Sequence, residues 1–249
     1  MPWTSARIGV GGWTPGTLAR HLRAMIDLSA GGARTTRYRW FVFALAAFYF
    51  VDRARTTTYG LDDFGWQFRY LTIWALTLSL IAAALMLARR FGAPDGRGAV
   101  YVSVTAVINM IVVVSYWRLY FRDPTLVNGD NPVAAYREYY LHLVGPLLQW
   151  IDVLCLKRGF RRPGAAALWL GVLVLAYLGW AELVVAPLND VPVGRVTSGL
   201  PYPFLNDMSL GARLVFYAAT WASGLIFIAL LRALQWGVDR WWPADRARG

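Results

Sequence analysis

Residues 99–121 read AVYVSVTAVINMIVVVSYWRLYF, and the arginine near the end of this stretch is its only charged residue. A run of about 20 apolar residues is long enough to cross the hydrocarbon core of a bilayer as a helix. A helix also satisfies its own backbone hydrogen bonds, which the bilayer interior cannot do. The stretch therefore predicts a transmembrane helix.

The rest of the chain has a similar character. Of its 249 residues, 57% are hydrophobic and 16% are charged, whereas about 25% of the residues in a soluble domain are charged. Further apolar runs lie at 38–51, 66–88, 136–156, 165–187 and 210–236. We expect an all-α integral membrane protein whose six transmembrane helices form one bundle over residues 38–236. An N-terminal segment, 1–37, and a tail, 237–249, flank this domain.

The positive charges predict how the bundle is oriented. Basic residues, Arg39 among them, gather at the start of the first run, after the second, after the fourth and after the last, and the other connections are balanced or acidic. Because basic loops stay in the cytoplasm, both termini are expected there, in the inner membrane of a bacterium. Residues 17–28 have apolar side chains at helical spacing and predict an amphipathic helix on the membrane surface, with His21 solvated.

Charge and cysteine content limit the classes of function. The net charge of +11 comes from arginines placed between apolar runs, so nucleic acid is not an expected partner. Cys155 is the only cysteine and most simply packs within a helix; with one interior histidine, no metal site and no cofactor are expected. The only lysine, Lys157, lies at a span end, which argues against a retinal receptor. The sequence leaves the oligomeric state open.

Two polar residues within the spans, Thr72 and His142, draw attention because polar groups in a membrane are costly to bury. Their spans both begin at the outer face, so the two side chains are expected at similar depth. Asp152 lies about 15 Å further along the helix and cannot orient the imidazole. In the simpler reading, His142 only joins two helices and Thr72 bonds to the carbonyl four residues earlier.

Three stretches carry a resemblance to a known family. They are GWQFRYLT at 65–72, His142 followed by Pro146 and Asp152, and YPFL at 202–205 followed by GARL at 211–214. In this order and spacing, over residues 59 to 230, the chain resembles the androgen-induced gene / androgen-dependent TFPI-regulating protein family and looks like a bacterial-type homologue.

The resemblance implies a six-span hydrolase of fatty acid esters of hydroxy fatty acids (FAHFAs) or similar acyl esters. It implies Thr72 as the nucleophile and His142 as its general base, a pairing that suits a hydroxyl needing a nearby proton acceptor. A lipid substrate with a free carboxylate would require a cation. The candidates for that role are Arg213, which we prefer, Arg118 and Arg137.

The remaining roles stay open at this level. Glu182, Asp207 or Asn206 could orient the imidazole, and Tyr202 or backbone amides could stabilise an oxyanion. The same fold could instead bind or sense a lipid without turning it over. Transport is a further alternative, although the sequence shows no inverted repeat of the kind transporters use.

Overall fold

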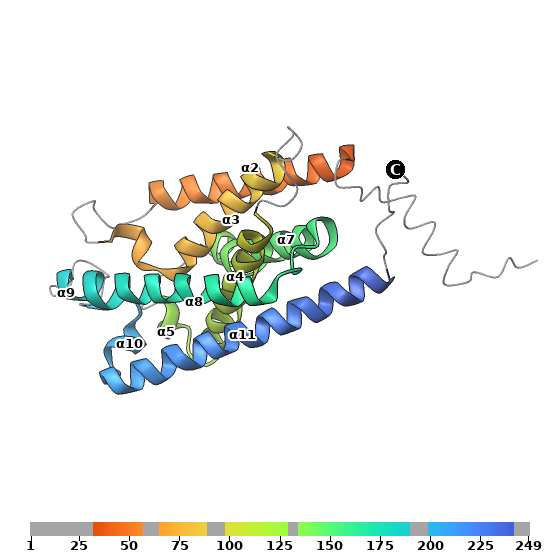
Figure 1. Cartoon of the computed structure of the whole chain (residues 1–249). Helices are drawn as coiled ribbons and strands as arrows, with labels where there is room; N and C mark the ends of the chain where they lie inside the picture. Colours follow the sequence, from red (N-terminus) through yellow and green to blue (C-terminus); the bar gives the residue numbers. More distant parts are fainter. Residues whose placement is uncertain (1–31, 57–64, 89–97, 129–133, 190–198, 242–249) are drawn as a thin grey trace, which may run out of the picture.

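The computed structural model describes residues 32–56, 65–88, 98–128, 134–189 and 199–241, and all the elements within these ranges are helices (Figure 1). This confirms the all-α fold class. The amphipathic helix expected at 17–28, with His21, lies outside the described residues, as do both termini.

Within the described ranges, five helical stretches are long and apolar enough to cross a membrane. Three are the single helices α3 (Leu71–Ala88), α4 (Ala99–Tyr120) and α11 (Leu210–Trp241). A fourth, Ala135–Lys157, joins α6 (Ala135–Tyr139), η3 (Tyr140–Val144), α7 (Gly145–Ile151) and η4 (Asp152–Lys157). The fifth, Pro163–Leu188, joins α8 (Pro163–Gly179), η5 (Trp180–Val185) and α9 (Ala186–Leu188).

The first expected span belongs to a sixth long helix, α2 (Ala33–Thr56), which lies along α3 (Figure 1). Arg39 and Asp52 bound its apolar middle, so α2 does not reach the apolar length of the other five. Shorter helices connect the long ones. They are η1 (Trp66–Arg69), α5 (Thr125–Asn128) and α10 (Pro203–Asn206).

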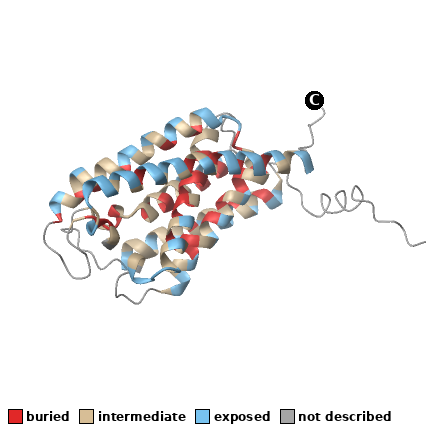
Figure 2. Ribbon diagram, turned by 90° about the horizontal axis from the view of Figure 1, so that it is seen from below, coloured by how far each residue is buried: buried red, intermediate tan, exposed pale blue. Residues whose placement is uncertain are grey.

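Helix α4, which corresponds to the apolar run at 99–121, is the central helix of the bundle. All its residues from 102 to 109 are buried, and α3, α7, α8 and α11 pack around it. Figure 2 shows the buried residues gathered along the middle of the bundle. A helix that is apolar on every side is suited to this position. The outer helices expose apolar faces, as helices in contact with lipid do.

Side chains of α4, α8 and α11 meet in the main core, where Ile108, Leu170 and Ile228 are buried. Gly224 lets α11 approach closely, since a Cβ atom there would lie 2.8 Å from Cδ2 of Leu170. Small residues of this kind allow helices to pack tightly in membranes.

A buried ion pair joins α2 to the fourth span. Nη2 of Arg39 lies 2.8 Å from Oδ1 of Asp152, and Nε of Arg39 lies 2.9 Å from Oδ2. Asp152 thus binds a neighbouring helix. Arg39 is one of the basic residues expected at the start of the first run, on the cytoplasmic face, but the structure buries it inside the bundle.

Candidate active site

The hydroxyl of Thr72 differs from other hydroxyls in these helices. A threonine in a helix usually bonds to the carbonyl four residues earlier, and Thr77 does so at 2.7 Å. For Thr72 that carbonyl belongs to Phe68, which already accepts the indole N–H groups of Trp74 at 2.8 Å and Trp180 at 3.0 Å. Because a carbonyl oxygen has two lone pairs, the Thr72 hydroxyl must find another partner.

That partner is His142. Oγ1 of Thr72 lies 3.4 Å from Nε2 of His142, a side chain that is only 5% exposed. The two residues come from α3 and from η3 in the fourth span, so the expectation of similar depth is met by direct contact. The separation is long for a hydrogen bond, but such contacts in ligand-free enzymes commonly tighten when substrate binds.

Glu138 holds the other nitrogen of the ring. Nδ1 of His142 lies 3.2 Å from the backbone oxygen of Glu138 and 3.2 Å from its carboxylate Oε2. A backbone carbonyl and a carboxylate only accept hydrogen bonds, so in the neutral ring Nδ1 carries the proton and Nε2 is the acceptor. The Thr72 hydroxyl, the His142 imidazole and the Glu138 carboxylate therefore lie one after another, with the imidazole in the middle.

The imidazole is clamped by side chains of neighbouring helices. The ring of Tyr116, on α4, stacks on it with 3.5 Å between ring centroids and 6° between planes. Tyr116 and Arg53 of α2 also interact with the Glu138 carboxylate. This packing fixes the ring plane, which leaves Nε2 directed at Thr72.

The backbone of His142 is held from α4 as well. Pro146, four residues on, has no N–H and cannot donate to the His142 carbonyl as an ordinary helical residue would. The indole N–H of Trp117 donates to that carbonyl at 2.8 Å instead. The chain forms a π-helical turn here, at Tyr140–Val144, and such turns are frequent at functional sites.

Tyr202 supports the turn that carries Thr72. Its hydroxyl accepts the backbone N–H of Leu71 at 3.1 Å and lies against Thr72. It thereby satisfies one of the amides that the first turn of a helix leaves unpaired. Burial raises the pKa of the Tyr202 phenol, so the group stays protonated and keeps its own proton to donate.

Two of the nominated arginines are occupied by carboxylates. Nε and Nη2 of Arg213 lie 2.9 and 3.1 Å from the two oxygens of Glu182, which also accepts the hydroxyl of Tyr217 at 2.6 Å. Nε of Arg137 lies 2.9 Å from Asp52. The preferred cation, Arg213, and one nominated orienter, Glu182, are thus partners of each other.

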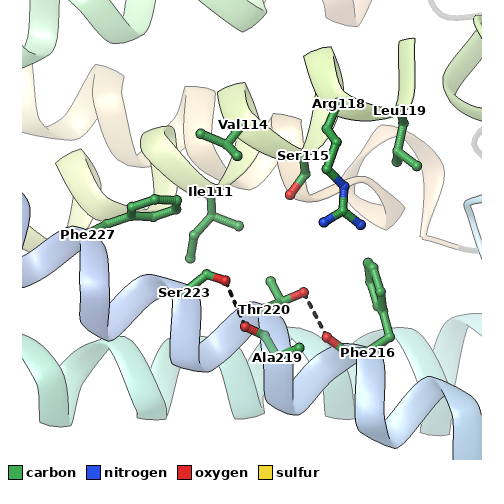
Figure 3. Close-up of a pocket in the computed structure, with 10 residues that line it drawn as sticks. All are labelled: Ile111, Val114, Ser115, Arg118, Leu119, Phe216, Ala219, Thr220, Ser223 and Phe227. Carbon is green, nitrogen blue, oxygen red and sulfur yellow. Dashed lines mark hydrogen bonds between the residues drawn. The ribbon is translucent and has the colours of Figure 1, made fainter. Parts of the chain in front are cut away.

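The remaining nominated residues lie elsewhere. The side-chain oxygen and nitrogen of Asn206 each form a hydrogen bond of 2.8 Å with the backbone of Leu200. Asp207 is exposed. Arg118 points from α4 into a groove beside α11 (Figure 3), whereas Tyr116 and Trp117 of the same helix face His142. The structure therefore brings Thr72, His142 and Tyr202 together, but not the arginines.

Glu138 is not among the candidates for orienting the imidazole that the sequence suggested. A signal was available, because Glu138 lies four residues before His142 and residues at that spacing are neighbours on one helix face. The sequence-based candidates on or near other spans were Glu182, Asp207 and Asn206, and Asp152 on the same span is too far along the helix.

The sequence of most of this bundle matches a known protein family. A family model described as FAR-17a/AIG1-like protein matches residues 35–236, which contain Thr72, Glu138 and His142. Searches of curated proteins and of solved structures gave no match. The matched range contains the second to fifth long helical stretches whole, and all but the first two residues of α2 and the last five of α11. The chain therefore belongs to the FAR-17a/AIG1-like family, the androgen-induced gene family that its three motifs resemble.

Proposed function

We propose that the protein is an intramembrane lipid-ester hydrolase in which Thr72 is the nucleophile and His142 the general base. One observation carries the proposal: the Thr72 hydroxyl is barred from the Phe68 carbonyl and faces Nε2 of His142 at 3.4 Å. Family membership suggests a membrane protein of hydrolase type, which is compatible with enzyme activity.

In the first half of the reaction, Nε2 of His142 takes the hydroxyl proton of Thr72 while Oγ1 bonds to the ester carbonyl carbon. The tetrahedral intermediate collapses, the bond to the alkoxide breaks, and His142 returns the proton to that alkoxide. In the second half, His142 takes a proton from water as the water attacks the acyl-threonine. It gives this proton to Oγ1 of Thr72 as the second tetrahedral intermediate collapses and the acyl–Oγ1 bond breaks. The products are an alcohol and a fatty acid, and Thr72 is regenerated.

Two neighbours have supporting roles in this scheme. The backbone carbonyl of Glu138 accepts from Nδ1, which keeps the ring in the tautomer that leaves Nε2 free. The Glu138 carboxylate, 3.2 Å from Nδ1, stabilises the imidazolium that forms during transfer. Tyr202 lies against Thr72 with a proton to donate and is the candidate donor to the oxyanion. Glu138 is a positioning residue, since it acts through His142.

The substrate class that we propose is a long-chain acyl ester, FAHFAs or similar esters. The site lies within a bundle of membrane spans, so a substrate arriving from the bilayer is already concentrated there. Aromatic side chains adjoin the site, among them Tyr116 and Trp117 against His142 and Tyr202 against Thr72. Such rings contact acyl chains without adding charge.

Hydrolysis of a FAHFA by purified protein in lipid nanodiscs tests the proposal, with the released fatty acid measured by mass spectrometry. Thr72→Ala and His142→Ala are expected to lower kcat at least about 1000-fold. Thr72→Ser keeps a hydroxyl and should stay within about tenfold of the wild type. Thr77→Ala is the matched control, because Thr77 is on the same helix but bonds to its own backbone; it should retain full activity.

Unchanged turnover in Thr72→Ala would overturn the mechanism. If the wild type binds the ester but releases no fatty acid from any lipid ester offered, the protein is a lipid-binding member of the family instead. A fluorophosphonate provides an independent measurement, since it should label the wild type and fail to label Thr72→Ala.

A further inference from the structure

The groove between α4 and α11 lies apart from the proposed active site. Ile111, Val114 and Leu119 of α4 and Phe216 and Phe227 of α11 give it apolar walls (Figure 3). On α4, successive residues are about 100° apart, so the side that lines the groove turns away from the side that holds His142.

One cation reaches into this groove. Figure 3 shows Arg118 extending from α4 toward α11, with Ser115 beside it and Phe216 and Thr220 opposite. Arg213 and Arg137 are paired with carboxylates. Within the described ranges, the structure records no hydrogen bond or ion pair for the Arg118 side chain. Arg118 is exposed near the end of a membrane helix, where a long side chain can hold its charged group in the interface. Its guanidinium is therefore accessible to an anionic group in the groove.

A second polar side chain in the groove, that of Ser115, also differs from its neighbours in its hydrogen bonding. The hydroxyls of Thr220 and Ser223 across the groove bond to their own helix at 2.9 and 2.8 Å. The hydroxyl of Ser115, by contrast, has no recorded partner among the residues that the structure describes. Ser115 precedes Arg118 by three residues, so both donors lie on one face of α4.

The combination fits an anionic single-chain lipid. A planar guanidinium fork matches the two oxygens of a carboxylate, and the Ser115 hydroxyl supplies a further donor. From Arg118 to Ile111 the apolar wall extends about 10 Å along α4, enough for part of one acyl chain. A groove between two helices leaves the second chain of a phospholipid outside, which favours a fatty acid over a phospholipid.

We propose that the α4–α11 groove is a second lipid site, which binds the carboxylate of a long-chain fatty acid at Arg118 and Ser115 and the acyl chain along Ile111 and Phe227. The site goes beyond the proposed hydrolysis and does not depend on it. If the protein is a hydrolase, one of its products belongs to the class of ligand that this groove accepts.

Photolabelling tests the site. The full chain is placed in nanodiscs of zwitterionic lipid with a diazirine-bearing palmitic acid, and labelled peptides are mapped by mass spectrometry. The wild type should be labelled on α4 and α11 at the groove, and Arg118→Gln should lose about tenfold or more of that label. Arg118→Lys, which keeps charge without the planar fork, should lose less. Arg122→Gln is the matched control, because it removes the same charge just beyond α4.

Thr72→Ala should be labelled like the wild type, so failure of the hydrolase proposal would not affect this result. The methyl ester of the same probe should label the groove weakly. Equal labelling of wild type and Arg118→Gln would overturn the inference, as would equal labelling by acid and ester. Retention of an anionic phospholipid that the fatty acid cannot displace would also overturn it.

Discussion

The fourth span, Ala135–Lys157, carries two buried ionisable clusters at opposite ends. At one end Asp152 and Arg39 make three side-chain contacts of 2.8 to 3.3 Å. At the other, the ring of His142 lies 3.2 Å from Oε2 of Glu138 and 3.4 Å from Thr72. Oε2 has no well-aligned hydrogen bond in the described part of the chain.

This difference is what we expect if the Arg39–Asp152 pair is structural and the cluster of Thr72, His142 and Glu138 is the proposed active site. Buried polar groups in proteins are nearly always fully hydrogen-bonded, and the Arg39–Asp152 pair follows that rule. The cluster of Thr72, His142 and Glu138 satisfies it only loosely, which leaves donors and acceptors available for a reacting molecule. Two clusters on one helix can therefore be assigned different roles from their hydrogen bonds.

The largest expected effect concerns the Arg39–Asp152 pair, whose hydrogen bonds are satisfied. Asp152→Ala leaves the Arg39 guanidinium buried without its counter-charge and should cost about 3 to 5 kcal/mol of stability. Replacing both partners, as Arg39→Met with Asp152→Leu, should recover most of that loss. Denaturant unfolding in detergent measures both. Full stability in Asp152→Ala would show that this pair does not support the bundle.

The second prediction concerns the cluster of Thr72, His142 and Glu138. Glu138→Gln keeps the size of the side chain but removes its charge, and should lower kcat about 100-fold with little change in KM or in the unfolding midpoint. Asp152→Asn should show the reverse pattern, lower stability with kcat of the folded protein preserved. If both variants lose only stability, the proposed contrast between the two ends fails.

The smallest expected effect concerns the hydrogen bond by which Trp117 of α4 holds the backbone of His142. Trp117→Phe removes the indole donor to the His142 carbonyl and should cost about 1 to 3 kcal/mol of stability, with kcat lowered about tenfold as the ring loses its alignment. Trp150→Phe is the matched control, since the Trp150 indole binds the Ala106 carbonyl at 2.9 Å. It should lose similar stability while kcat stays unchanged.

Much of the bundle was readable from hydropathy. The run expected at 99–121 is the helix Ala99–Tyr120, and the run expected at 210–236 begins at the first residue of Leu210–Trp241. The apolar pattern works because the bilayer sets the length of a span. The start of α3 was missed, as the run beginning at residue 66 opens with a separate 3₁₀ turn, Trp66–Arg69.

Side-chain partners were harder to predict. The contact between Thr72 and His142 joins residues 70 positions apart, and only the family resemblance suggested it. The pairing of Arg39 with Asp152 spans 113 positions, and no local pattern reports which helices meet. Glu138 was different, because its spacing from His142 is local and the sequence alone would have allowed the prediction.

The bond from Trp117 to the His142 carbonyl has a mechanical consequence. Together with the Tyr116 ring, it ties the imidazole to α4 rather than to its own helix alone. A tilt of α4 would carry the ring with it and change its distance from Thr72. Since helix tilt responds to the thickness of the surrounding bilayer, the acyl length of the host lipids should change the rate of the proposed hydrolysis.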